Sequence, residues 1–181
     1  GNEYVWTVNG ELYTDVTGNV IEFTEVGAYE VSVIAKSGEG CESDPSEIET
    51  ATIFEKLIVE LLSSGDICFG DTLTFIAEGG NEYIWTVNGE PYTDVTGNVI
   101  EFTEVGLYDV SVIAKSGDGC ESDPSEIVSA EIYEKPVVTL TVSESVCFGD
   151  TLTFTAEGGN EYIWTVNGEP YTDVTGNVIE F

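Results

Sequence analysis

Apolar and polar residues alternate along most of the chain with a period of two. In the stretch 71–78, for example, Leu73, Phe75 and Ala77 occupy every second position. This alternation is typical of β-strands with one buried face, and the 3.6-residue period of helices is nearly absent. We expect strands at 57–64, 71–78, 82–88, 99–103, 107–115 and 126–133, and a further short strand at Tyr92–Thr96.

Turn residues separate these stretches. Asn88-Gly89 has the signature of a type I′ hairpin, and further glycines end the other runs at Gly79-Gly80, Gly97, Gly106 and Gly117-Asp118-Gly119. Six or seven short strands in about 80 residues predict an antiparallel β-sandwich and an all-β fold class.

The pattern repeats with a period of 79 residues. Gly1-Asn2-Glu3-Tyr4 recurs at Gly80 and again at Gly159, and Trp6, Trp85 and Trp164 keep the same spacing. A period of this length suits one small domain and is too long for a solenoid unit. We expect linkers at Lys56-Leu57 and at Glu134-Lys135-Pro136. Residues 57–135 then form one complete repeat, residues 1–56 a repeat lacking its start, and residues 136–181 a repeat lacking its end, as in a window of a longer tandem array.

Two aromatic residues make the prediction more specific. Trp85 lies in the third strand, where immunoglobulin-like sandwiches bury a central aromatic residue. Tyr108 begins the strand at 107–115, which is the position of a tyrosine corner.

Several short motifs carry a family resemblance. They are Cys-Phe-Gly-Asp-Thr-Leu-Thr-Phe from Cys68, Tyr-Ile-Trp-Thr-Val-Asn-Gly from Tyr83, Gly-x-Tyr-x-Val-x-Val from Gly106, and Gly119-Cys120. The chain resembles the PKD-like and Ig-like tandem repeats of giant bacterial surface adhesins, including those of gliding bacteria. It differs from the PKD pattern after Trp85, where Thr86-Val87-Asn88-Gly89-Glu90 replaces an Asp-Phe-Gly-Asp-Gly turn. The resemblance implies an extracellular, cell-surface protein.

Composition excludes several functions. The 181 residues include 35 Asp and Glu, 4 Lys and Arg, and no His, so the formal net charge is −31. Without histidine there is no His-based triad and no ordinary zinc site. A polyanion is repelled by nucleic acid and by anionic membranes, and no apolar run is long enough to span a bilayer. We therefore expect no enzyme, no nucleic-acid partner and no membrane insertion.

The cysteines occupy two positions per repeat, Cys41 and Cys120, and Cys68 and Cys147. In a protein that resembles secreted adhesins they suggest disulfides. Sandwich geometry places Cys68 and Cys120 at opposite ends of one domain, about 25 Å apart if strand 71–78 separates them. We therefore expect bonds between neighbouring repeats, with all four partners outside these 181 residues. A bond within one domain, free thiols and links between fibres stay open as alternatives.

Acidic residues allow two interpretations. Residues 57–135 carry 16 Asp and Glu against Lys115 and Lys135, and such a surface keeps an array extended and in solution. The alternative is a calcium ion at a domain junction, since oxygen ligands suit Ca²⁺. Its candidate ligands are Asp66, Asp71, Asp118, Glu121 and Asp123. We expect no other cofactor.

Surface contacts are the last open question. The tryptophans, with Tyr83 and Tyr108, have the inward phase of a core more than that of a sugar-stacking platform. Ile84 and Ile113 have the outward phase and form a candidate lateral contact.

The sequence as a whole predicts the stalk of an extracellular adhesin or surface filament, whose partners are neighbouring repeats of the same polypeptide. The alternatives are a carbohydrate-binding module that anchors on surface glycans and a self-assembling filament subunit that contacts other fibres.

Overall fold

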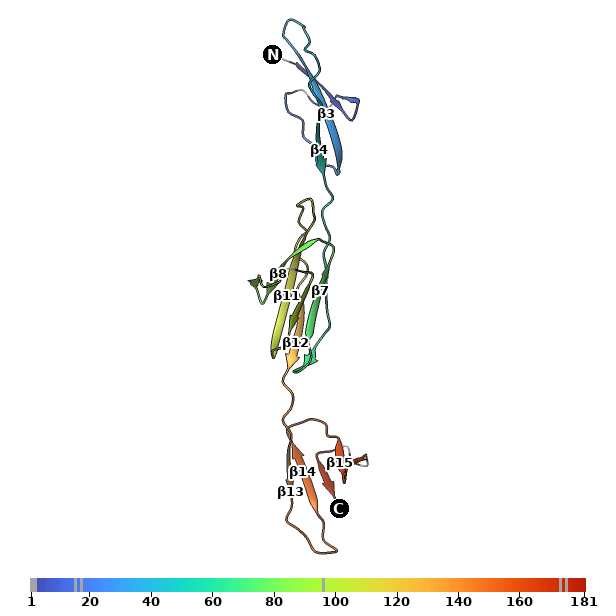
Figure 1. The fold of residues 1–181 in the computed structure, drawn as a ribbon, viewed down its shortest axis with the longest axis vertical. Helices are drawn as coiled ribbons and strands as arrows, with labels where there is room; N and C mark the ends of the chain where they lie inside the picture. Colours follow the sequence, from blue (N-terminus) through green and yellow to red (C-terminus); the bar gives the residue numbers. More distant parts are fainter. Residues whose placement is uncertain (1–2, 15, 17, 96, 173, 175) are drawn as a thin grey trace. The chain divides into compact units, whose positions relative to one another are not determined.

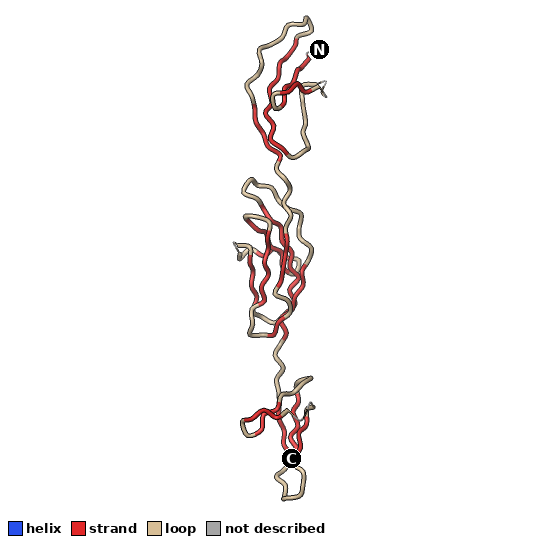
Figure 2. Tube along the Cα trace, turned by 90° about the vertical axis from the view of Figure 1, so that its right-hand side faces the viewer, coloured by secondary structure: helices blue, strands red, loops and turns tan. Residues whose placement is uncertain are grey.

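The chain folds entirely into strands, turns and loops in the part that the structure describes. This computed structural model describes residues 3–14, 16, 18–95, 97–172, 174 and 176–181 (Figures 1 and 2). Contacts between Cα atoms divide the chain into two compact units. The described strands form five sheets, which fall along the sequence into a first, a middle and a last group. Within the described residues, no helix has the length and apolar character needed to span a membrane.

The middle group of strands forms two sheets. One has the order β10-β7-β5 and the other the order β6-β12-β11-β8-β9. The strands are β5 (Glu60–Ser63), β6 (Ile67–Cys68), β7 (Leu73–Glu78), β8 (Glu82–Val87), β9 (Glu90–Tyr92), β10 (Val99–Phe102), β11 (Gly106–Lys115) and β12 (Val128–Tyr133). Buried side chains come from both sheets, so the predicted all-β sandwich is confirmed.

Two details of the strand prediction are wrong. The short strand after the Asn88-Gly89 turn is Glu90–Tyr92, because pairing with β8 fixes its register at Trp85↔Tyr92 and residues 93–95 leave the sheet. The expected end of that strand, Thr96, lies outside the described residues. Sequence reasoning also missed β6, a two-residue strand that pairs in parallel with β12. It is too short to produce an alternating pattern.

The interior of the middle sandwich is closed and apolar. Its largest fully buried side chains are Trp85, Phe75, Leu73, Ile100, Ile132, Val110 and Val112. The indole N–H of Trp85 donates to the carbonyl of Gly97 at 3.1 Å, so the buried ring keeps a partner for its one polar atom. The predicted core role of Trp85 is confirmed, since only 1% of the side chain is exposed.

Tyr108 forms the predicted tyrosine corner. Its hydroxyl donates to the carbonyl of Glu104 at 2.9 Å, and its ring stacks on Phe102 with 4.1 Å between centroids. The corner thereby ties the loop before β11 to the body of the sandwich.

Strands in the first and last parts of the chain repeat these features. The first sheet has the order β2-β1-β3-β4, and the last group forms the sheets β13-β14-β17 and β15-β16. The strands are β1 (Glu3–Val8), β2 (Glu11–Tyr13), β3 (Gly27–Lys36), β4 (Glu49–Ile53), β13 (Thr139–Val142), β14 (Thr153–Glu157), β15 (Trp164–Val166), β16 (Glu169–Tyr171) and β17 (Val178–Glu180). Trp6 donates to the carbonyl of Gly18, and Trp164 donates to that of Gly176.

Glycine is required at two kinds of turn. Asn88 and Gly89 both have positive φ, at 52° and 80°, as the predicted type I′ turn demands. Gly79 has φ of 105°, and a Cβ added there would overlap the carbonyl oxygen of Ile58. The turn between β7 and β8 therefore needs a residue without a side chain.

We predict that Gly79→Ala destabilises the middle sandwich by about 2 kcal/mol or more, because the new Cβ meets backbone that cannot yield. Hydrogen exchange measured on peptides from β7, β8 and β11 reports this free energy. Gly117→Ala is the matched control, since Gly117 has no positive φ and open space around its Cα. Equal protection in the two variants would contradict the argument.

Candidate functional site

The two ends of the middle sandwich carry most of the residues that the sequence singled out. We define the leading end as Lys56 with the connection 116–127 between β11 and β12. The trailing end is β6 with the turn Phe69–Asp71 and Lys135. At the leading end, Lys56 Nζ lies 2.6 Å from Asp123 Oδ1. At the trailing end, Lys135 Nζ lies 3.0 Å from the position that a Cβ on Gly70 would take. Each end of the sandwich thus adjoins one of the segments that join it to the rest of the chain.

Serine hydroxyls build the leading end. The connection 116–127 runs beside β11 without becoming a regular strand, since Pro124 has no N–H to donate. Ser122 Oγ accepts from the N–H of Ala114 at 3.0 Å, and Ser125 Oγ accepts from the N–H of Val112 at 3.0 Å. These hydroxyls take the place of missing backbone partners. Ser43 and Ser46 repeat the arrangement beside β3.

An ion pair closes the same connection. Lys115 Nζ lies 2.7 Å from Glu121 Oε1, and Lys36 and Glu42 form the equivalent pair at 2.7 Å. The hydrogen bond to Glu121, and then its negative charge, raise the pKa of Lys115 above its ordinary value of 10.5.

Three of the five acidic residues proposed as calcium ligands have side-chain partners within the chain. Glu121 pairs with Lys115 and Asp123 pairs with Lys56, both at the leading end. Asp66 lies at the trailing end, where its carboxylate accepts from the N–H of Glu131 at 2.9 Å. Asp118 lies in the Gly117–Gly119 turn and Asp71 beside Phe69. Among the described residues, the structure gathers no group of three acidic, cysteine or histidine side chains that could hold a metal ion. Calcium binding stays a prediction.

All four cysteines are free thiols in this chain. Cys68 pairs with Tyr133 in the β6–β12 ladder, at the trailing end. Cys120 is at the leading end, where its carbonyl accepts from Ser116 N at 2.9 Å. The two thiols of one sandwich therefore lie at opposite ends. Bonds to cysteines outside the chain stay a prediction.

Ile84 and Ile113 are direct cross-strand neighbours on β8 and β11. Ile84 is 42% exposed and Ile113 is half-buried, so both contribute to the outer face of the five-stranded sheet. The equivalent pair in the first sheet is Val5 and Ile34. The structure brings this predicted pair together.

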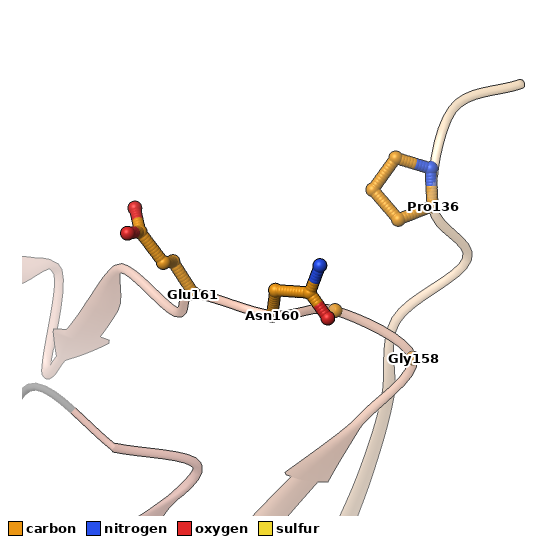
Figure 3. Close-up of a pocket in the computed structure, with 5 residues that line it drawn as sticks. Pro136, Gly158, Asn160 and Glu161 are labelled. Atoms are coloured by element: carbon orange, nitrogen blue, oxygen red, sulfur yellow. The ribbon is translucent and has the colours of Figure 1, made fainter. Parts of the chain in front are cut away.

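A hollow of about 810 Å³ lies between Pro136 and the turn Gly158–Glu161 (Figure 3). In the middle sandwich the corresponding turn is covered by the end of β11. Asn81 N donates to the carbonyl of Lys115, and Asn81 Oδ1 accepts from Gly117 N. The hollow therefore lies beside a turn that, in the middle sandwich, contacts the end of β11 and Gly117. Among its lining residues, Glu161 is the ionisable one.

Comparison with known proteins gives only distant likenesses. No protein-family model and no curated protein sequence matches the chain. Among solved structures, fibronectin(III)-like modules of CbhA from Clostridium thermocellum are 20% identical, with a TM-score of 0.42 over 73% of this chain and 78% of that chain. A structure from a 1.5-MDa bacterial ice-binding adhesin, concerned with its host cell surface retention, is 15% identical, with a TM-score of 0.42 over 99% of this chain and 74% of that chain. These scores are too low to place the chain in either group, and its resemblance to adhesin repeats stays a prediction.

We predict that Tyr133 ionises above pH 10.0, because the negative charges of Asp66, and then of Glu131, raise the pKa of its hydroxyl. The folded protein then keeps this proton where the unfolded chain has lost it. The resulting stabilisation is present below about pH 10 and is lost as pH rises through the folded pKa. Titration of the tyrosine ring carbons by NMR measures the shift.

In the same titration, Asp66→Asn is expected to lower the pKa of Tyr133. Asp118→Asn at the other end of the sandwich is the control and is expected to leave this pKa unchanged. If Asp66→Asn leaves the pKa of Tyr133 unchanged, the charge of Asp66 is not the cause of the raised pKa.

Proposed function

We propose that the chain is part of the stalk of an extracellular adhesin or surface filament, built from tandem β-sandwich repeats. The observation that carries this proposal is the recurrence of the same interior contacts at the 79-residue spacing. The tryptophan-to-glycine hydrogen bond occurs in all three copies, from Trp6, Trp85 and Trp164. The tyrosine corner occurs at Tyr29 and Tyr108, and the lysine–glutamate pair at Lys36 and Lys115. Repetition of one self-contained unit adds length, which is what a stalk requires.

The two ends of the repeat support a head-to-tail arrangement. Lys56 precedes the sandwich and contacts its leading end, while Lys135 follows it and adjoins its trailing end. Successive repeats of this kind enter at one end and leave at the other. Bonds between Cys68 of one repeat and the leading-end cysteine of the next would then stiffen each junction, and a calcium ion at the junction would do the same.

Charge supports extension. The net charge of −31 on 181 residues makes neighbouring repeats repel one another, and this repulsion opposes collapse of the array. The same charge keeps the surface free of nucleic acid.

The burial of the aromatic residues weighs against sugar binding. Trp85 is closed inside the sandwich and Tyr108 is engaged in its corner, so neither presents a ring to a glycan. A second candidate function has a specific observation in its favour. The outward pair Ile84 and Ile113 gives the sheet an apolar contact through which a filament subunit could associate laterally.

Small-angle X-ray scattering of the full chain tests the stalk. We predict a radius of gyration well above roughly 16 Å, the value for a compact domain of this length. The radius is expected to shrink as salt screens the repulsion between repeats. A mass that grows with concentration in the same measurement would favour the filament subunit, whereas a monomer near 16 Å would contradict the stalk.

A further inference from the structure

The shortest strand of the middle sandwich holds the last strand in place. β6 pairs in parallel with β12 through Ile67↔Ile132 and Cys68↔Tyr133. Phe69 extends the ladder by donating its N–H to the carbonyl of Tyr133 at 2.8 Å. These contacts connect the first part of the repeat to the strand that leaves it.

The side chain of Asp66 lengthens this pairing. Asp66 Oδ1 accepts from the N–H of Glu131 at 2.9 Å, and Asp66 Oδ2 accepts from the hydroxyl of Tyr133 at 3.4 Å. A single carboxylate therefore contacts two positions of β12. Hydrogen bonds to an ionised group are stronger than those between neutral groups.

The residues that form these contacts differ between copies of the repeat. At the 79-residue spacing, Asp66 corresponds to Ser145, and Tyr133 corresponds to Phe54. The serine has one hydroxyl oxygen where Asp66 has two carboxylate oxygens, and the phenylalanine has no hydroxyl to donate. Neither residue could therefore reproduce both bonds that join Asp66 to β12. Both positions of the contact therefore vary between copies of the repeat.

Tension along a stalk would load this pairing in shear. The chain reaches β6 from the N-terminal side and leaves β12 on the C-terminal side, and the two strands run in the same direction. Pulling the two termini apart slides β6 and β12 past each other along their axes. Hydrogen bonds across a sheared pair are strained together, whereas bonds at an opening edge break one after another.

We propose that Asp66, with Glu131 and Tyr133, is a mechanical latch that raises the resistance of the middle repeat to stretching. The latch makes this repeat stronger than the same repeat would be with Ser and Phe at the two positions. The proposal rests on the proposed stalk function for the direction of the load.

Constant-force optical tweezers on the full chain, held at residues 1 and 181, test the latch. The middle sandwich gives the largest unfolding step, since residues 60–133 form the longest folded stretch. Asp66→Ser installs the residue found at 145 and is expected to raise the unfolding rate at constant force about tenfold. Tyr133→Phe installs the residue found at 54 and is expected to act in the same direction, with little further effect in the double variant.

Ser129→Ala is the matched control. Its hydroxyl donates to Asp109 Oδ1 at 2.6 Å, and Ser129 is exposed like Asp66. Ser129 belongs to β12 but lies outside the residues that pair with β6. We expect this variant to change the unfolding rate less than about threefold. Equal effects of Asp66→Ser and Ser129→Ala, or none from Asp66→Ser, would overturn the latch. If Asp66→Ser unfolds the repeat without force, the test is the unfolding rate of Tyr133→Phe compared with that of Ser129→Ala. Equal rates would overturn the latch.

Failure of the latch and failure of the stalk are distinguishable. A compact particle in X-ray scattering refutes the stalk, whereas unchanged unfolding rates in an extended particle refute only the latch.

Discussion

The closed interior around Trp85 is the constraint on which the rest of the structure depends. An indole that is 1% exposed must find a partner for its N–H, and the carbonyl of Gly97 supplies it. This bond fixes the loop before β10 over the core, while β7 and β11 supply apolar faces from the two sheets. Because every strand of both sheets comes from residues 60–133, the repeat closes on itself. Its outer faces and ends are then left for contact with surroundings.

Because the interior of the repeat is closed, the repeat connects to the rest of the chain at its two ends. In a sandwich with a closed interior, tension is transmitted through the strands that connect to the flanking segments of the chain. Lys56 with Asp123 and Asp66 with β12 are contacts near those joins. The proposed stalk function and the proposed latch therefore both concern residues that contribute little to the core.

Much of the fold was predictable from local pattern. Alternation predicts strands because one face of each is buried, and Asn88-Gly89 predicts its hairpin because both residues must take positive φ. Trp85 and Tyr108 were predictable because their positions within the strand order are typical of immunoglobulin-like sandwiches. β6 was not predictable, since two residues carry no period and their parallel pairing with β12 is decided by tertiary structure. The role of the Ser122 and Ser125 hydroxyls was missed too, although the repeated Ser-Asp-Pro-Ser motif was a visible signal.

The candidate site was predictable only in part. The outward phase of Ile84 and Ile113 follows from strand alternation, and their direct pairing required the register. The acidic residues were proposed as calcium ligands because they are close in sequence and were expected at the ends of the domain. In the structure, Asp66, Glu121 and Asp123 each have a partner of their own within the chain. Sequence alone does not reveal such partners, because they depend on how separate loops approach one another.

The central claim is that one 79-residue copy is a complete folding unit, and the most direct measurement is the NMR spectrum of residues 57–135 alone. The account predicts dispersed signals at the positions seen in the full chain, with a slowly exchanging Trp85 indole proton. Poorly dispersed signals, as an unfolded chain gives, or an indole proton that exchanges rapidly with water, would contradict it.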